Sequence, residues 1–479
     1  MAITSIGIGS GIDLEGLVTD LIAAEREPQE LRLNLKETLA TASISALGSL
    51  KGTVSAFQAS LENLKNSDFY GGRTATSGDS ALFTVTADTT ATVGSYSIEV
   101  NKLAGANKVA TNAAFTNPNA TVGEGSVTLG FVGGNSFDIA VAATDNLTAL
   151  RDAINNAADN VGVTASLITA TTGTELVITA NDTGTANQLT ISVTDTDAQN
   201  QDSNGLSRLF YDGSDPDNTI NGLNQIQQIN AAEDARIYVD GFAATSSTNE
   251  FSGVLQGLTI TALADDGGAL VLPSANLVVN IDKASVKSEI QTFVGSYNEL
   301  LTVLSSLTDY DQATGTRGLL GSDSTINTLE NQIRRIITDT VDGADSSLDN
   351  LAILGISTNR NGSVALDSET LDNTINNNFD NIGALMGGDN GITRRLDILL
   401  ESFLAFDGLF AIKEDTINTQ LSEIEQQRSS LELRLTAIEE RFRSQFSTLD
   451  ILVQQLNTTG DFLTQQLDAA ARIVNRDNS

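Results

Sequence analysis

The chain has 479 residues, with 26 Lys and Arg against 61 Asp and Glu, and a formal net charge of −35. So strong a negative charge repels phosphate backbones and anionic lipid, which disfavours nucleic acid and membrane surfaces as partners. The sequence contains no His, Cys or Trp, which excludes Ser-His-Asp and Cys-His catalysis, disulfides, and metal binding through imidazole or thiolate. We therefore expect that the protein is not an enzyme and uses no cofactor, and the length predicts several domains.

The N-terminal segment lacks the basic region, long apolar run and cleavage motif of a conventional signal peptide. No segment is apolar enough to span a bilayer, so we expect no membrane insertion. Gly7, Gly9 and Gly11 resemble a phosphate-binding loop, but only six residues precede them, too few for the strand that such a fingerprint requires. A flexible start to a helix is the preferred interpretation.

The first helical pattern follows this segment. Apolar residues at helical spacing begin at Leu14 and include Leu17 and Leu21, and Asp13 stands where an N-cap would accept a backbone hydrogen bond. Pro28 lacks an amide hydrogen, so we expect a break or kink in the helix there. A second apolar stretch with the same spacing comprises Leu47, Leu50, Val54, Phe57, Leu61 and Leu64.

The middle of the chain has the pattern of β-strands. Short alternating or β-branched runs are separated by Gly, Asn, Asp and Thr clusters that favour turns. The runs are residues 95–100, 127–129, 137–141, 161–168, 176–178, 189–193, 237–239 and 258–262, with one short helix predicted at 147–157. The acidic clusters 195–197 and 212–217 offer oxygens for calcium but lack the EF-hand spacing, so ordinary turns are preferred.

The strongest periodicity lies in the C-terminal part, which has no proline after Pro273. A heptad-like run covers residues 286–307. A longer repeat with alternating spacings of four and three is made of Ile417, Leu421, Ile424, Arg428, Leu431, Leu435, Ile438, Phe442, Gln445, Leu449, Leu452 and Leu456. A 3.5-residue repeat of this length is typical of a coiled-coil seam, and forty residues of helix reach about 60 Å. The alternative is that the terminal helices are core helices of separate domains.

These patterns predict an α+β multidomain protein in which helical coiled-coil termini and a helical domain enclose two inserted β-rich domains. We expect a terminal coiled-coil leg from residues 1–45 and 410–479, and a helical domain from 46–80 and 283–409. An inner β-rich domain is expected from 81–110 and 220–282. An outer β-rich domain with one short helix is expected from 111–219.

Several segments, in order along the chain, resemble one family: the bacterial flagellar filament-cap family FliD, also called hook-associated protein 2. Its N-terminal signature is similar to residues 5–13 (SIGIGSGID), Leu17-Val18 and 21–26 (LIAAER). Later markers resemble 95–104 (SYSIEVNKLA), then 239–241 with 247–249 and 257–260, then 355–357 with Gly362 and Leu366-Asp367, and finally 441–446 (RFRSQF) with Leu449. Residues 127–193 resemble an insertion motif shared among flagellar hook and filament proteins.

The resemblance implies an exported structural protein that forms a homo-oligomeric ring, a pentamer in the family's usual form, at the distal end of the growing filament. There it would retain exported flagellin and promote its polymerisation. The implied partners are flagellin, the flagellar export chaperone and the export apparatus, and the implied location is the filament tip after secretion through the flagellar export channel. The seam residues expected to mediate self-association or filament contact are Leu14, Leu17, Leu21, Ile417, Leu421, Ile424, Leu431, Leu435, Ile438, Phe442, Leu449, Leu452 and Leu456.

Two other functions stay open at this point. A flagellar hook–filament junction protein shares helical termini around a β-rich middle. A tip adhesin would bind mucin or a host glycan through an exposed acidic β-rich surface. A carboxylate-pair hydrolase is a distant third, since it requires two carboxyl groups that face each other across a cleft.

Overall fold

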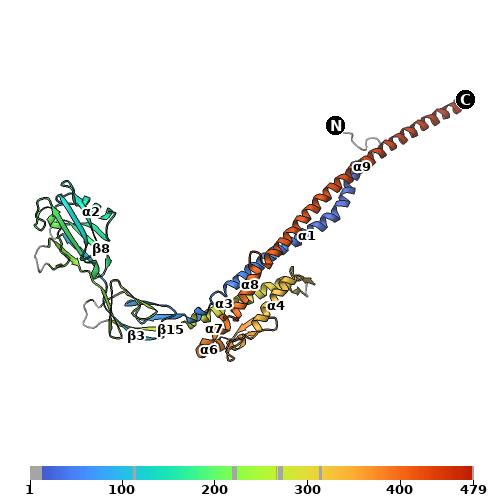
Figure 1. The fold of residues 1–479 in the computed structure, drawn as a ribbon. Coiled ribbons are helices and arrows are strands. Elements are labelled where there is room, and N and C mark those ends of the chain that lie inside the picture. The colour runs from blue at the N-terminus through green and yellow to red at the C-terminus, as the bar shows by residue number, and fades with distance from the viewer. Residues whose placement is uncertain are drawn as a thin grey trace. The chain divides into compact units, whose positions relative to one another are not determined.

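A computed structural model of the protein describes residues 13–111, 115–217, 224–265, 267, 273–311 and 315–476. The chain divides into two compact units, and each is taken by itself: a helical unit from the chain up to Tyr70 and from Lys283 onward, and a β-rich unit, Gly71–Asp282. The protein is thus a mixed helix-and-sheet protein with a long C-terminal helix, as predicted (Figure 1). The finer division into four domains stays a prediction. Residues 5–12 of the N-terminal signature lie outside the described residues.

The helical unit is built around two long helices and a group of shorter ones (Figure 1). Its helices are α1 (Leu14–Ala59), α3 (Lys283–Thr308), α4 (Ser324–Thr338), α5 (Leu351–Leu354), α6 (Ser368–Asn377), α7 (Phe379–Gly387), α8 (Ile392–Leu404) and α9 (Leu409–Arg476), after the 3-10 turn η1 (Ser67–Gly71) that follows α1. Two small hairpins join β16 (Tyr310–Asp311) to β17 (Thr316–Arg317) and β18 (Ile356–Thr358) to β19 (Val364–Leu366). The run predicted at 286–307 is helix α3.

Aromatic packing joins the C-terminal part of α1 to α3. The ring of Phe57 lies 5.8 Å from that of Phe293 and 6.0 Å from that of Tyr297, and all three side chains are buried. Rings at these separations and tilts attract one another beyond the area that they bury. The second apolar stretch of the sequence therefore belongs to the core of the helical unit.

Helix α1 begins as the sequence predicts but does not break where expected. The Oδ1 atom of Asp13 accepts a hydrogen bond from the Gly16 amide at 2.9 Å, which confirms the N-cap. The helix does not break at Pro28, because α1 continues without interruption from Leu14 to Ala59, and a kink at that residue stays a prediction. A proline removes one backbone hydrogen bond, and buried contacts on both sides of it, at Ile22 and Leu33, hold the helix in place.

Two sheets enclose the first core of the β-rich unit. Its strands are β1 (Arg73–Ser77), β2 (Phe83–Ala87), β3 (Gly94–Lys102), β11 (Ala235–Val239), β12 (Phe242–Ser246), β13 (Glu250–Ser252), β14 (Leu258–Ala262) and β15 (Ser274–Ile281). They form the antiparallel sheets β1-β15-β3-β11-β12 and β13-β14-β2. Apolar side chains from both sheets, among them Ile98, Ile237 and Ile260, fill the space between them.

A second core lies in the part of the β-rich unit inserted between β3 and β11. Its elements are β4 (Ala106–Thr111), β5 (Gly125–Phe131), β6 (Ser136–Val141), α2 (Leu147–Asn156), β7 (Val163–Ala170), β8 (Gly173–Thr183), η2 (Thr185–Asn187), β9 (Leu189–Asp195), η3 (Gly205–Leu209) and β10 (Ile226–Asn230). The strands form the sheets β10-β4-β8-β7 and β6-β5-β9. Helix α2 adds Leu150 and Ile154 to this core. All eight predicted strands and the predicted short helix are confirmed.

Candidate assembly surface

Helices α1 and α9 lie side by side and run in opposite directions (Figure 1). Five ion pairs link them: Glu15 with Arg443, Glu25 with Arg434, Arg26 with Glu432, Glu37 with Arg428 and Lys51 with Glu414. Residue numbers rise along α1 as they fall along α9, which defines an antiparallel pair. Each of these side chains is more than a third exposed, so solvent screens the pairs and each adds little to the stability of the fold. The ion pairs therefore define the register of the two helices, and they add little to the stability of the helix pair.

The apolar seam between the two helices provides the larger stabilisation. Its buried members are Val18, Ile22 and Leu33 of α1 and Ile424, Leu431 and Leu435 of α9, with Ile438, Phe442 and Phe446 partly buried against them. Burying one such aliphatic side chain stabilises the folded state by about 1.5–3 kcal/mol. Of the other predicted seam residues, Leu14 and Ile417 are buried and Leu421 is half-buried.

Leu17 and Leu21 lie on a different face of α1 from the seam. Their side chains are 42% and 38% exposed, and Leu31, Leu35 and Leu39 are exposed on the same face at 62%, 61% and 49%. At about 100° per residue these five positions fall within an arc of about 80°. We call them the outer stripe of α1. The sequence pattern grouped Leu17 and Leu21 with the seam and did not single out the other three.

The seam of α9 changes register near Phe446. The sequence repeat passes through Gln445, but the structure leaves Gln445 exposed and places Phe446 against the seam, with its ring 6.2 Å from that of Phe442. From Phe446 the spacing of three and four continues through Leu449, Val453, Leu456, Gly460, Leu463 and Leu467. We call these residues from Leu449 to Leu467 the overhang seam. Gly460 supplies no side chain to this seam. The spacing of three and four that starts at Phe446 is the sequence pattern that indicates it.

The overhang seam lies beyond the Glu15–Arg443 pair, where α9 extends past the first described residue of α1 (Figure 1). Its leucines are strongly exposed: Leu449 at 45%, Leu456 at 63%, Leu463 at 56% and Leu467 at 69%. The predicted seam residue Leu452 is also exposed, at 55%, beside this stripe. Continuous apolar exposure of this kind marks an interaction surface.

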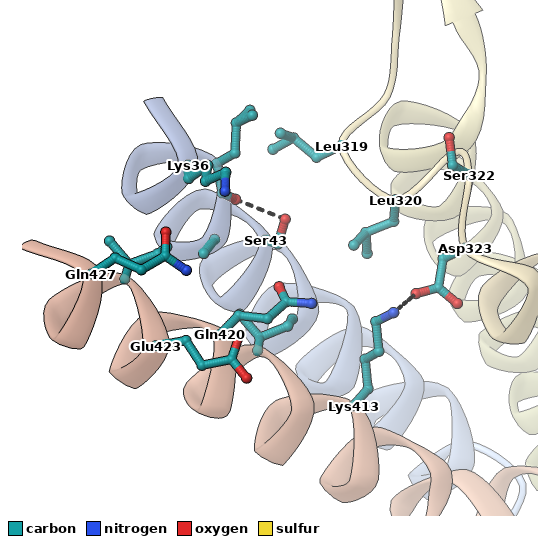
Figure 2. A pocket seen from close by; sticks show the side chains of 14 residues that line it. Lys36, Ser43, Leu319, Leu320, Ser322, Asp323, Lys413, Gln420, Glu423 and Gln427 are labelled. Carbon is teal, nitrogen blue, oxygen red and sulfur yellow. Dashed lines mark hydrogen bonds and ion pairs between the residues drawn. The ribbon is translucent and has the colours of Figure 1, made fainter. Parts of the chain in front are cut away.

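A groove of about 490 Å³ lies where α1 and α9 meet the turn before α4 (Figure 2). Leu39, Leu319 and Leu320 line its apolar part, while Lys36 and Gln420 line its polar part. Lys413 pairs with Asp323 at 2.5 Å and so ties the turn to α9. Burial favours the neutral acid, but the hydrogen bonds from Lys413 and from the Thr325 amide outweigh it and hold the pKa of Asp323 below its usual range.

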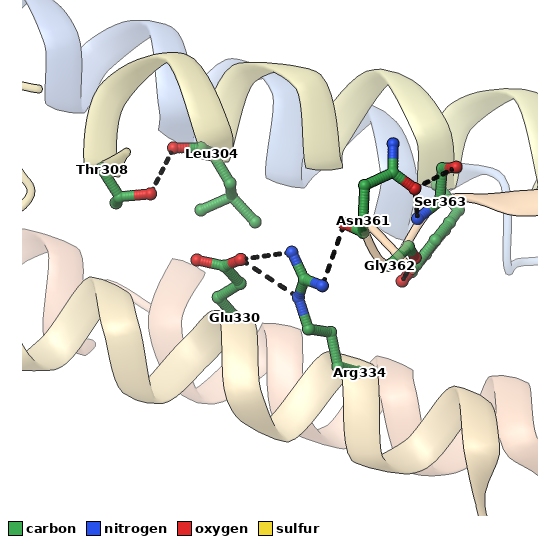
Figure 3. Close-up of polar contacts among 8 residues, drawn as sticks. Leu304, Thr308, Glu330, Arg334, Asn361, Gly362 and Ser363 are labelled. Carbon is green, nitrogen blue, oxygen red and sulfur yellow. Dashed lines mark hydrogen bonds and ion pairs between the residues drawn. The ribbon is translucent and has the colours of Figure 1, made fainter. Parts of the chain in front are cut away.

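A turn at Gly362 fixes α4 to α3, and it explains one of the family markers (Figure 3). Gly362 has φ of +86°, and its carbonyl accepts a hydrogen bond from the hydroxyl of Tyr297 at 2.8 Å. Arg334 donates to the Asn361 carbonyl at 3.0 Å and pairs with Glu330. A Cβ at Gly362 would lie 1.8 Å from Nη1 of Arg334. This position therefore requires glycine for both its conformation and its space.

Other family markers are also turn and cap residues. Gly355 ends α5 in the left-handed conformation with φ of +101°, and Asp367 caps α6 by accepting from the amides of Glu369 and Thr370. Asp240 and Gly241 form the turn between β11 and β12, where the Asp240 carboxylate accepts from the Ser97 amide at 2.8 Å. These residues serve the fold rather than a ligand.

The acidic clusters act as turns. Asp212 accepts hydrogen bonds from the amide and hydroxyl of Ser214, and Asp195 accepts from the Leu206 amide at 2.7 Å. Within the described ranges, no group of three or more His, Cys, Asp or Glu side chains is placed to hold a metal ion. Among the described helices, none has the length and apolar character needed to cross a membrane.

Known families match most of the chain. The family described as Flagellar hook-associated protein 2 N-terminus matches residues 10–107, and Flagellar hook-associated protein 2 C-terminus matches residues 232–458. The Flagellin hook IN motif matches residues 126–195, which confirms the insertion motif predicted at 127–193.

Relatives with similar sequences and structures carry related names. The chain is 30% identical to flagellar hook-associated protein 2 of Escherichia coli K12 and 29% identical to the B-type flagellar hook-associated protein 2 of Pseudomonas aeruginosa PAO1, with 98% of each chain covered. The crystal structure of the D1-D2-D3 domains of the flagellar cap protein FliD from Escherichia coli superposes with a TM-score of 0.63 at 29% identity, covering 78% of this chain and 99% of that one. The sequence signature and the similarity over 98% of the chain agree, and the chain belongs to the flagellar hook-associated protein 2 family.

Proposed function

We propose that this protein forms the cap at the distal end of a growing flagellar filament, retains exported flagellin there and promotes its polymerisation. Family membership and the similarity to the Escherichia coli cap protein support the proposal. The observation that carries it is the long α9, which pairs with α1 over part of its length and then continues with an exposed apolar stripe. A leg of this kind needs a protein partner to cover it.

We propose a separate role for each of the two units. The β-rich unit would close the filament channel, and the paired helices α1 and α9 would engage the end of the filament or neighbouring copies. The functional form would be a homo-oligomeric ring, a pentamer by analogy with the family. Flagellin, the flagellar export chaperone and the export apparatus would be its partners, and it would leave the cell through the flagellar export channel. A cap works by shape and contact, so no catalytic role is proposed.

Substitutions in the leg test the proposal. Leu449→Asp with Leu456→Asp changes only exposed side chains, so the chain should fold, while capping should fail and unpolymerised flagellin should appear in the culture medium. Leu435→Asp with Phe442→Asp should have the same effect by opening the α1–α9 seam. Leu433→Asp is the matched control, because Leu433 is 72% exposed on the opposite side of α9. Normal filament length in both double variants would overturn the leg hypothesis.

The location of the wild-type protein separates the alternatives. Antibody labelling at filament tips supports the cap, whereas labelling between hook and filament would indicate a junction protein. Binding of mucin or a host glycan by the full chain, with filament assembly unaffected by the leg variants, would instead favour the tip adhesin.

A further inference from the structure

We propose that, in the free homo-oligomeric ring, the overhang seams of all copies pack together, parallel and in register, as a short helical bundle around the ring axis. The inference rests on the proposed function in one respect, since it assumes the ring. The overhang seam begins beyond the Glu15–Arg443 pair, and its leucines stay exposed in the described part of the chain. A seam with a 3.5-residue repeat is complemented by a helix with the same repeat, and every other copy in the ring supplies one.

The charge of α9 changes where the overhang begins. Residues 413–443, which lie along α1, contain twelve charged side chains, and five of them pair with side chains of α1. Residues 444–470 contain only three, Asp450, Asp461 and Asp468. Charged flanks select a partner of opposite charge, whereas uncharged flanks allow a helix to pack on copies of itself. The composition of the overhang therefore favours a second copy over a charged partner.

The flanks of the overhang seam suit parallel packing in particular. In heptad notation its a positions are Val453, Gly460 and Leu467, its d positions Leu449, Leu456 and Leu463, its g positions Leu452, Thr459 and Gln466, and its e positions Asp450, Asn457 and Thr464. In a parallel bundle, each g side chain faces the e side chain five residues further along the neighbouring helix. Asp450 then faces Gln445, and the other facing residues are uncharged. No like charges meet.

The width of the apolar face favours a bundle over a two-helix coiled coil. A two-helix seam needs only the a and d positions, whereas helices of larger bundles present a wider stripe that includes e or g. Leu452 extends the apolar face of the overhang on its g side and is exposed in the single chain. Cyclic symmetry places the same segment of every copy at the same height around one axis. A parallel, in-register bundle therefore closes together with the ring.

The bundle is short enough to open again. The overhang seam is about 27 Å long at 1.5 Å per residue, too short for strong association of free helices, but the ring holds the copies at a high effective concentration. Gly460 leaves a gap at one a position, with no atom within 4 Å of the place of a Cβ. When the ring caps a filament, exported flagellin has to pass the ends of the legs, so the bundle separates there.

Cysteine pairs in the full-length chain test the arrangement, because the chain contains no native cysteine. A chain with Leu452→Cys and Asn457→Cys carries one thiol on each flank of the seam. Oxidation of the ring with copper phenanthroline should give a ladder of disulfide-linked species on a non-reducing gel, up to the size of the complete ring. Each single variant should cross-link weakly by itself, since identical flanks do not face each other in a parallel bundle. A mixture of the two single variants should give dimers only.

Controls and contradictory results are equally defined. Thr458→Cys with Gln465→Cys places both thiols on the outer side of the bundle and should give little cross-linking. Adding Leu463→Asp to the double-cysteine chain should reduce the ladder about tenfold or more, whereas adding Leu433→Asp should leave it unchanged. A ladder that stops at the dimer would overturn the bundle in favour of a two-helix coiled coil. Strong cross-linking of each single variant with itself would overturn the parallel orientation.

Filling the gap at Gly460 gives a test by gain of association. Gly460→Leu in the double-cysteine chain should raise the yield of the full-size species about twofold or more, because it adds an apolar side chain to the seam. Gly460→Gln is the matched control, since glutamine favours the helix as leucine does but adds no apolar group. An equal gain from both substitutions would contradict packing of this position in a seam.

The two proposals can fail independently. If the ladder is absent from a sample that sedimentation velocity shows to be the ring, while the wild-type protein labels filament tips and retains flagellin, the bundle is wrong and the cap function stands. If the ladder forms but the protein is not found at filament tips, the cap function fails and the bundle stands. A wild-type chain that stays monomeric at every concentration would overturn the bundle as well.

Discussion

Single residues decide how the elements of the helical unit are joined. Gly362 is in the left-handed region, its carbonyl accepts from the buried Tyr297, and Arg334 occupies the space that a Cβ would need. Burial raises the pKa of Tyr297, so its hydroxyl stays protonated and donates at any physiological pH. The turn therefore connects α3, α4 and the β18–β19 hairpin through one position.

We predict that Gly362→Ala destabilises the helical unit by about 1–3 kcal/mol, because it combines backbone strain with displacement of Arg334 from Asn361 and Glu330. Urea unfolding followed by circular dichroism at 222 nm measures the change. Gly295→Ala is the control: Gly295 lies inside α3 with open space around its Cβ position, so alanine should stabilise the helix by up to about 1 kcal/mol. Equal effects of the two substitutions would contradict this account of Gly362.

The Asp323–Lys413 pair makes stability depend on pH at one residue. The folded-state pKa of Asp323 lies below its usual range, so the stabilisation is present above the unfolded-state pKa and is lost as the pH falls through the folded-state pKa. We predict that Asp323→Asn, which still caps α4, destabilises the unit by about 1–2 kcal/mol at pH 7. The difference from wild type should shrink as the pH falls below the unfolded-state pKa of about 4.

Urea unfolding between pH 7 and pH 3 measures this difference. Asp407→Asn is a suitable control, since Asp407 is exposed between α8 and α9 and its replacement should leave the free energy of unfolding close to that of wild type. A gap between wild type and Asp323→Asn that stays constant down to pH 3 would mean that the ion pair with Lys413 does not cause it.

At the scale of elements, periodicity predicts helices and strands well but places their faces less well. The 4–3 repeat correctly predicted α9 and the buried positions Ile424, Leu431 and Leu435. The predicted repeat passed through Gln445, whereas the seam in the structure passes through Phe446. A strict heptad continues through a polar residue, but the apolar side of the actual helix shifts by one position there. The helix break expected at Pro28 does not occur, because packing on both sides of the proline outweighs the backbone hydrogen bond that it removes.

Two of the strands that the sequence did not reveal have little apolar–polar alternation. Strand β10 (Ile226–Asn230) reads IQQIN and β12 reads FAATS, with little alternation. Backbone hydrogen bonds fix the positions of both strands. Strand β10 pairs with β4, which lies far away in the sequence, and β12 pairs with β11, which is already part of a sheet. Backbone hydrogen bonding is nearly independent of side-chain type, so it leaves no apolar pattern to read.

At the scale of the whole molecule, the two units have separate cores. The β-rich unit, Gly71–Asp282, contains two apolar clusters of its own. We predict that this fragment folds alone and unfolds cooperatively, with a circular dichroism spectrum dominated by strands. Removal of residues 1–70 and 283–479 should leave its midpoint of urea unfolding within about 0.5 M of the corresponding transition in the full chain. A fragment with no unfolding transition would show that it depends on the helical unit.

The sequence by itself determined the family, the presence of long terminal helices, the eight central strands and the absence of His and Cys chemistry. Local periodicity, turn residues and composition are properties of neighbouring residues, so they can be read without a structure. Only the tertiary structure decided that α1 has two apolar faces and that α9 extends beyond the end of the α1–α9 pair. Which face a helix buries depends on the partner that packs there, and that partner lies about 400 residues away in the chain.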